Sequence, residues 1–151
     1  MENEGLGITG EVIVEELEPG TENVRSREVC KNIICAGCAV ALATAIVSAA
    51  APTPFNWMIL STSQTAVARA TTAIPATRFS CAGAITPTRV GSVITWVNTF
   101  VAQVGASPIW KSGMENSTAG SGYLWNETLF SASKDNVNND VRVTYNVSIA
   151  P

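Results

Sequence analysis

The alternation of apolar and polar residues near the C-terminus constrains the fold of this chain more than any other feature. Val141, Val143, Tyr145, Val147 and Ile149 alternate with Arg142, Thr144, Asn146 and Ser148. Successive side chains of a β-strand point to opposite faces of the sheet, so this segment predicts a strand with one dry face and one wet face. The dry face needs an apolar surface to pack against, and a chain of 151 residues is long enough to supply one within a single domain.

Other segments of the chain show the same strand character. The Pro19-Gly20 turn separates two strand-like runs, 10–17 and 23–29, and predicts an opening hairpin. A second, longer hairpin is expected from 78–85 and 92–102 around a turn at 86–91, and the remaining strands are expected at 55–62, 108–111, 123–131 and 141–149. The sequence therefore predicts a mainly β protein, an antiparallel β-sandwich of about seven or eight strands.

One long run interrupts this β pattern. Residues 33–51 are nineteen residues without a charge, eight of them alanine, and Pro52 and Pro54 follow. Alanine is the strongest helix former and proline stops a helix, so we expect one Ala-rich helix at about 34–50, packed on the sandwich. The expected organisation is an acidic N-terminal arm at 1–9 and a single β-rich domain at 10–151 that includes this helix.

The same run supports an alternative interpretation. Nineteen uncharged residues are long enough to cross a membrane, and Arg25, Arg27 and Lys31 precede them. Insertion into a bilayer favours Leu, Ile, Phe and Val, however, whereas this run is dominated by alanine. The alternative is a single-pass membrane protein with a span at about 33–51 and a β-rich ectodomain, as in a viral or pilus-like surface protein.

The cysteines raise a question of metal binding. Cys30, Cys35 and Cys38, with Cys81 downstream, follow the ligand order of a plant-type [2Fe–2S] site. Cys38 runs directly into the apolar segment, and a free cysteine in such surroundings behaves as a small hydrophobic residue. We therefore expect buried thiols, with no metal ligand and no cofactor.

The composition leaves little material for catalysis or nucleic-acid binding. The chain has no histidine, a net charge of −3 and no basic stripe with interleaved aromatic residues. Histidine is the commonest general base and the commonest metal ligand, and the chain also lacks a phosphate-binding Gly-x-x-x-x-Gly-Lys-Ser/Thr loop. We expect a protein that is not an enzyme, with no catalytic or cofactor-binding residues and no nucleic-acid partner.

The acidic residues are unevenly placed. Residues 1–22 contain seven glutamates and no Lys or Arg, whereas the rest of the chain carries nine basic and five acidic residues. Such an acidic segment is a plausible contact element for a basic partner surface.

The order of these segments resembles a class of small virion structural proteins of tailed bacteriophages and related viruses. The similarity is carried by an opening β-hairpin, by 28–37 leading into an Ala-rich segment, and by the aromatic strand and Ser/Thr-rich loop at 55–65. Near the C-terminus it is carried by Leu124-Trp-Asn-Glu-Thr-Leu-Phe-Ser-Ala, a polar turn, and Asp140-Val-Arg-Val-Thr-Tyr-Asn-Val-Ser-Ile149.

The resemblance implies a non-enzymatic role in the virion, as a capsid decoration or cement protein or as a tail or fibre accessory subunit. The partners that it implies are copies of the chain itself, in a homo-oligomer, and capsid or tail proteins of the same virion. The N-terminal arm and the sheet edges would make these contacts. A membrane location belongs only to the alternative interpretation.

Overall fold

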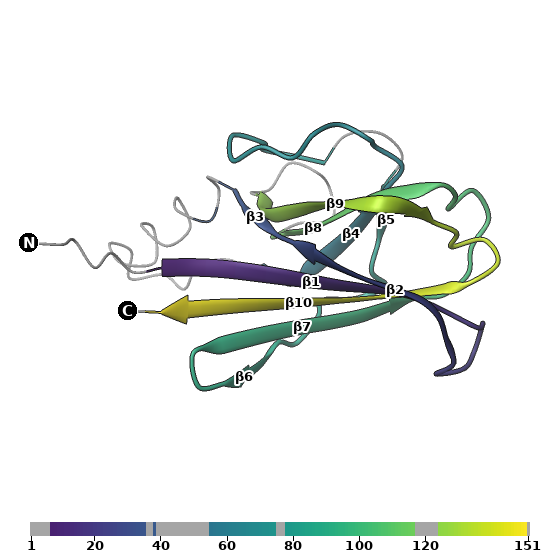
Figure 1. The fold of residues 1–151 in the computed structure, drawn as a ribbon, viewed down its shortest axis with the longest axis horizontal. Helices are drawn as coiled ribbons and strands as arrows, with labels where there is room; N and C mark the ends of the chain where they lie inside the picture. The colour runs from purple at the N-terminus through teal and green to yellow at the C-terminus, as the bar shows by residue number, and fades with distance from the viewer. Residues whose placement is uncertain (1–6, 36–37, 39–54, 75–77, 117–123, 151) are drawn as a thin grey trace, which may run out of the picture.

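The protein is mainly β. The computed structural model describes residues 7–35, 38, 55–74, 78–116 and 124–150, and in these residues ten strands form two antiparallel sheets of five strands each (Figure 1). The strands are β1 Gly7–Leu17, β2 Val24–Lys31, β3 Ile33–Ile34, β4 Trp57–Ser61, β5 Arg78–Ser80, β6 Thr88–Val90, β7 Val93–Phe100, β8 Ile109–Glu115, β9 Leu124–Lys134 and β10 Asp140–Ala150. The number of strands exceeds the seven or eight expected.

The first sheet has the strand order β2-β1-β10-β7-β6 and contains the strand that the sequence predicts most clearly. β10 lies between β1 and β7, with Val12 opposite Tyr145 and Tyr145 opposite Trp96. Val141, Val143, Tyr145 and Val147 of β10 are fully buried. The alternation in the sequence is therefore confirmed, because one face of a central strand is covered and the other is not.

The second sheet has the order β3-β9-β8-β4-β5 and shares a core with the first. Residues of both sheets form one buried cluster: Val12, Val14, Trp96, Phe100, Val141, Val143, Tyr145 and Val147 come from the first sheet, and Met58, Leu60, Ile109, Met114 and Phe130 come from the second. Apolar faces of two sheets that bury each other are the arrangement of a β-sandwich.

The outer face of the second sheet is also covered. Residues 62–74, which contain no helix or strand, lie over this sheet on the side away from the first sheet (Figure 1). Ile74 of this segment forms a second buried cluster with Cys35, Ile59 and Leu124. The contact is close, because a Cβ built on Gly113 would lie 2.3 Å from Ile74 Cδ1. This segment therefore covers the second sheet without adding a strand to it.

One continuous segment passes from the first sheet to the second. β2 pairs with β1, the next residue is Asn32, and β3 then pairs with β9 of the other sheet. The backbone N–H of Asn32 donates to the carbonyl of Gly10 over 3.2 Å, and Cys35 N–H donates to the carbonyl of Trp125 over 2.7 Å. The segment therefore leaves β1 at Asn32, and this crossing shapes the site described below.

The predicted helix at 34–50 is not seen as an element in the described residues, of which only Cys38 is helical. Ile34 belongs to β3, so the helix cannot begin there, and residues 36–37 and 39–54 lie outside the described part of the chain. Local propensity favoured a helix from Ile34, but pairing of Ile33 and Ile34 with Glu127 and Asn126 places these residues in a sheet.

The predicted hairpin of 78–85 with 92–102 is wrong. β5 pairs with β4 in the second sheet, whereas β7 lies in the first sheet between β10 and the short strand β6. The turn lies at Gly91-Ser92, where Gly91 has a φ of 59°, rather than over the whole of 86–91. β8 is also longer than the strand expected at 108–111 and reaches Glu115, because residues 112–115 pair with β9.

Candidate functional site

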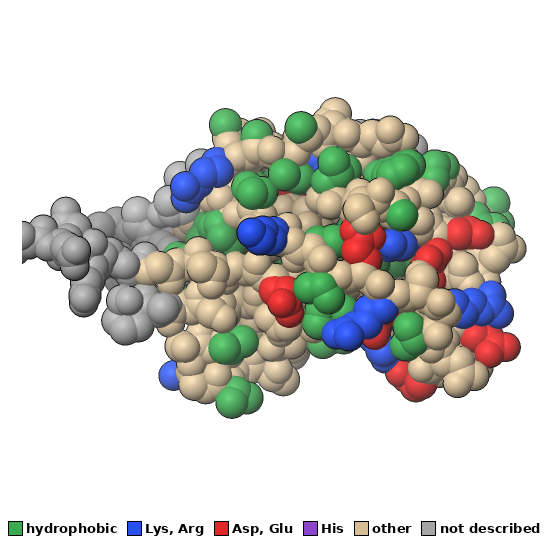
Figure 2. Space-filling view, in the orientation of Figure 1, with side chains coloured by type: hydrophobic (Ala, Val, Ile, Leu, Met, Phe, Trp, Pro, Cys, Tyr) green, Lys and Arg blue, Asp and Glu red, His purple; other side chains and the backbone are tan. Residues whose placement is uncertain are grey.

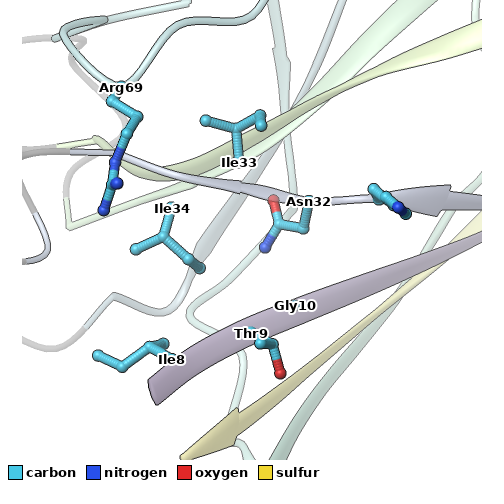
Figure 3. A pocket seen from close by; sticks show the side chains of 8 residues that line it. Ile8, Thr9, Gly10, Asn32, Ile33, Ile34 and Arg69 are labelled. Atoms are coloured by element: carbon cyan, nitrogen blue, oxygen red, sulfur yellow. The ribbon is translucent and has the colours of Figure 1, made fainter. Parts of the chain in front are cut away.

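The crossing of the chain between the two sheets opens a groove at one end of the molecule. β1 and β3 diverge from Asn32 towards the end where β1 begins (Figure 1). The space between them has a volume of about 450 Å³ and is lined by Ile8, Thr9, Gly10, Lys31, Asn32, Ile33, Ile34 and Arg69 (Figure 3). We call these eight residues the edge groove.

Both strands that border the edge groove have an open edge. β1 pairs with β10 over its whole length, but with β2 only from Glu11 onward. Ile149 of β10 donates its N–H to the carbonyl of Ser92, on the side of β10 that faces away from β1. Ile8 lies opposite Ile149 on β1. Because opposite residues of an antiparallel pair point their backbone groups either towards each other or away from each other, the N–H and C=O of Ile8 point away from β10 and into the groove. Ile34 faces the groove in the same way, since Cys35 beside it bonds to β9.

Asn32 is the least satisfied polar side chain of this site. It is 9% exposed, and neither atom of its amide group has a hydrogen-bond partner among the described residues. Its amide points into the space between Ile34 and the Ile8–Gly10 segment (Figure 3). A buried amide without a partner is costly, and an added peptide group could supply its missing bonds.

Gly10 makes the position of Asn32 possible. A Cβ built on Gly10 would lie 2.5 Å from Asn32 Nδ2 and 2.9 Å from Asn32 Cβ. Any larger residue at position 10 would therefore push the Asn32 side chain out of the place that it occupies.

The charged residues of the edge groove are both cationic. Lys31 and Arg69 are exposed, and neither forms an ion pair within the described part of the chain. Glu11 lies opposite Lys31 on β1, but the two side chains form no ion pair. On the face shown in Figure 2, Lys and Arg side chains lie over the region of β3 with few acidic neighbours, whereas most Asp and Glu side chains lie towards the opposite end.

The outer face of the first sheet carries an exposed apolar row. Val29, Ile13, Thr144 and Val97 lie opposite one another on β2, β1, β10 and β7. Val29 is 54% exposed and Val97 is 47% exposed. The rows on either side are polar and charged, so this row is a modest apolar strip on a solvated sheet face.

The charged residues of the second sheet serve its structure. Lys111 Nζ donates to Glu127 Oε2 over 3.0 Å and to Thr65 Oγ1 over 3.1 Å, and Glu127 Oε1 accepts the Ala68 N–H over 2.9 Å. Arg78 donates to Glu115 and to the carbonyl of Ile74. Each pair bonds to a residue of 62–74 and so holds this segment against the sheet.

The four cysteines do not converge. Cys81 belongs to the main core, whereas Cys35 lies in the separate cluster on the other face of the second sheet. All four thiols are free, and no three potential metal ligands gather within the described residues. Burial raises the pKa of Cys30 and Cys35 to about 12 and also raises the pKa of Cys38 and Cys81. The spacing in the sequence therefore does not bring Cys35 and Cys81 to one place in the fold.

The acidic N-terminal segment is divided by the fold. β1 begins at Gly7 and not at Gly10, so the predicted arm at 1–9 loses its last three residues to the sheet, and residues 1–6 lie outside the described part. Arg142 pairs with both Glu15 and Glu22. The acidic residues of 1–22 are thus not one contact element, because several are bonded within the fold.

The aromatic residues mostly serve the core. Trp125 packs edge-on against Trp96, with ring centroids 5.6 Å apart, and against Phe55, with centroids 4.7 Å apart.

Asn32, Lys31 and Arg69 were not among the site residues expected from the sequence. Only the break in strand character at Asn32 could have indicated that the chain changes sheets there.

The described residues form no helix that is long and apolar enough to cross a membrane. Ile33 and Ile34, the first two residues of the alternative span at 33–51, form β3, and most of the rest lies outside the described part.

Neither a family model, a curated protein nor a solved structure matches the chain.

Proposed function

We propose that this chain is a non-enzymatic virion structural subunit, a capsid decoration or cement protein or a tail or fibre accessory protein that assembles with copies of itself. The order of its segments, which resembles that of such proteins, supports the virion setting. The partners in this proposal are further copies of the chain and the capsid or tail proteins beside them.

The observation that carries the assembly role is the pair of open strand edges at the edge groove. Unpaired N–H and C=O groups on an edge strand are a template for another strand, and natural proteins use such edges for β-strand addition between subunits. Ile8 and Ile34 offer such groups from two strands that border one apolar space.

The apolar row on the outer face of the first sheet supports the same role. Val29 and Val97 expose about half of their surface on a sheet face that is otherwise polar. A second subunit or a capsid surface that covers this row would remove the apolar area from water.

Localisation on particles tests the virion role. Antibodies raised against the purified chain should label intact virus particles from the source of the sequence, and mass spectrometry of washed particles should detect its peptides. Particles that lack the chain, with the chain recovered in the detergent phase of host membranes, would contradict the proposal and favour the membrane alternative.

A further inference from the structure

We propose that the edge groove binds the acidic residues 1–6 of a second copy of this chain as an added β-strand. The inference rests on the self-assembly part of the proposed function and names the segment that makes the contact. Three features of the groove support it: the open strand edges, the charges and the buried amide of Asn32.

The backbone of the edge groove has pairing positions that an added strand can fill. Ile8 on β1 and Ile34 on β3 each direct an N–H and a C=O into the space between the two strands. Strand addition supplies partners for such groups through main-chain hydrogen bonds, and its specificity comes from side chains on alternate positions. The occupant is therefore an extended peptide segment.

The charges of the groove select an acidic segment. Lys31 and Arg69 stand at the groove without ion pairs among the described residues. A cationic rim around an apolar floor attracts a strand that carries negative charge, both during encounter and in the bound state.

The N-terminal segment of the chain supplies the acidic residues for this contact. Of the glutamates before residue 23, Glu15 and Glu22 pair with Arg142, and Glu16 accepts bonds from Ser26 and the Asp135 N–H. Glu2 and Glu4 precede β1 and lie in a stretch with no basic residue. Residues 1–6 thus bring two acidic residues into the chain directly before the first strand of the sheet.

The residue order of this segment suits the groove. In an extended strand Glu2 and Glu4 share one face, so both can lie along the rim of Lys31 and Arg69. The opposite face carries Met1, Asn3 and Gly5, and Met1 can pack on the isoleucines of the groove floor. The amide atoms of Asn32 are buried without a partner among the described residues, so the side chain has to turn towards the groove before a peptide group of the added strand can bond to it.

The donor is a second copy rather than the same molecule. β1 borders the groove and starts at Gly7, so residues 1–6 of the same chain would have to reverse direction at once to lie beside Ile8. A neighbouring copy can present the segment without this reversal, and each copy then both donates and receives a strand.

A charge exchange between two variants tests this assignment. The groove variant carries Lys31→Glu and Arg69→Glu, and the arm variant carries Glu2→Lys and Glu4→Lys. Sedimentation velocity of the full chain should show self-association weakened about tenfold or more in each variant alone. An equimolar mixture of the two variants should recover association, because the basic arm of one then meets the acidic groove of the other.

Matched controls separate this contact from a general change of charge or a loss of folding. Arg25→Glu with Arg89→Glu gives the same change in net charge at exposed positions outside the groove, and this variant should associate as the unmodified chain does. Near-ultraviolet circular dichroism and thermal unfolding should match for all variants. A fluorescent peptide of residues 1–6, capped at both ends, should bind the arm variant and not the groove variant.

Three outcomes would overturn the inference: association of the groove variant equal to that of the control, no recovery in the mixture, or a peptide that binds both variants equally. If particles carry the chain but the groove variant still assembles normally, this inference is overturned and the virion role is left intact. If the chain associates through the groove but is absent from particles, the virion role is overturned and this inference is left intact.

Discussion

Lys111 and Glu127 lie on the neighbouring strands β8 and β9 and form an ion pair, Nζ to Oε2, of 3.0 Å with side chains that are 1% and 0% exposed. Thr65 and Ala68 from the covering segment bond to the same pair. A buried charge is tolerated only when its partner and its hydrogen bonds are present. The pair therefore fastens residues 62–74 to the outer face of the second sheet.

Replacing Lys111 should destabilise the protein strongly. Lys111→Met leaves the Glu127 carboxylate buried without its cation, and we expect a loss of about 3–5 kcal/mol in the free energy of unfolding. Urea denaturation followed by tryptophan fluorescence measures this loss. The double variant with Glu127→Gln should recover part of it, because the uncompensated charge is then absent.

An exposed ion pair provides the control for that experiment. Arg27, whose side chain is 56% exposed, lies 3.7 Å from Glu15. Arg27→Met should change the free energy of unfolding by less than about 1 kcal/mol. Equal losses for Lys111→Met and Arg27→Met would contradict the structural role given to the buried pair.

The strands of this fold could be predicted where side-chain period and burial agree. β10 lies between two strands, so one of its faces is dry and its alternation is readable in the sequence. The opening hairpin could be predicted because Pro19-Gly20 marks the turn, and Gly20 indeed has a φ of 71°.

The choice of strand partners could not be predicted. Arg78–Ser80 and Val93–Phe100 are near in sequence, yet they belong to different sheets. Strand propensity describes one segment at a time, whereas pairing depends on which faces meet across the core. The edge groove was missed for the same reason, because Ile8 and Ile34 meet only after the chain changes sheets at Asn32.

Gly10 should be intolerant of a side chain. Gly10→Ala places a methyl group 2.5 Å from Asn32 Nδ2 and 2.9 Å from its Cβ, and we expect a loss of about 1–3 kcal/mol in the free energy of unfolding. Gly83→Ala is the matched control, since nothing lies within 4 Å of the added Cβ there. Thermal unfolding of both variants decides the point, and equal midpoints would refute the close approach of Asn32 to β1.

Glu28 should make the stability of the protein sensitive to acid. Partial burial alone would raise the pKa of this carboxyl, but hydrogen bonds from Lys134, the Ser131 N–H and Cys30 lower it to about 2 from its usual 4.5. These bonds join β2 to β9 of the other sheet. Because the folded pKa is depressed, the stabilisation is complete well above pH 4.5 and is lost as the pH falls towards 2.

The variant Glu28→Gln should isolate this contribution. At pH 7 we expect it to be less stable than the unmodified chain by roughly 1–2 kcal/mol, a range that allows for partial solvation of the carboxylate. The difference should shrink between pH 4.5 and pH 2 as Glu28 becomes protonated. Urea unfolding at several pH values measures it, and a difference that stays constant over this interval would count against the bonded carboxylate.

The thiols should be unreactive in the folded protein. Burial holds the pKa of Cys30 and Cys35 near 12, so at pH 8 their thiolate fraction is about a thousandfold below that of an ordinary cysteine. Iodoacetamide labelling followed by mass spectrometry should show slow modification of the folded chain and rapid modification of all four cysteines in urea. Fast labelling of Cys35 without denaturant would mean that this thiol is not covered as described.

Sedimentation velocity of the unmodified full chain, without detergent and over a range of protein and salt concentrations, tests the assembly role most directly. Association through a cationic groove and an acidic strand predicts an oligomer that forms with increasing protein concentration and dissociates as salt screens the charges of Lys31 and Arg69. A monomer at every concentration, or a chain that stays in solution only with detergent, would contradict the assembly role.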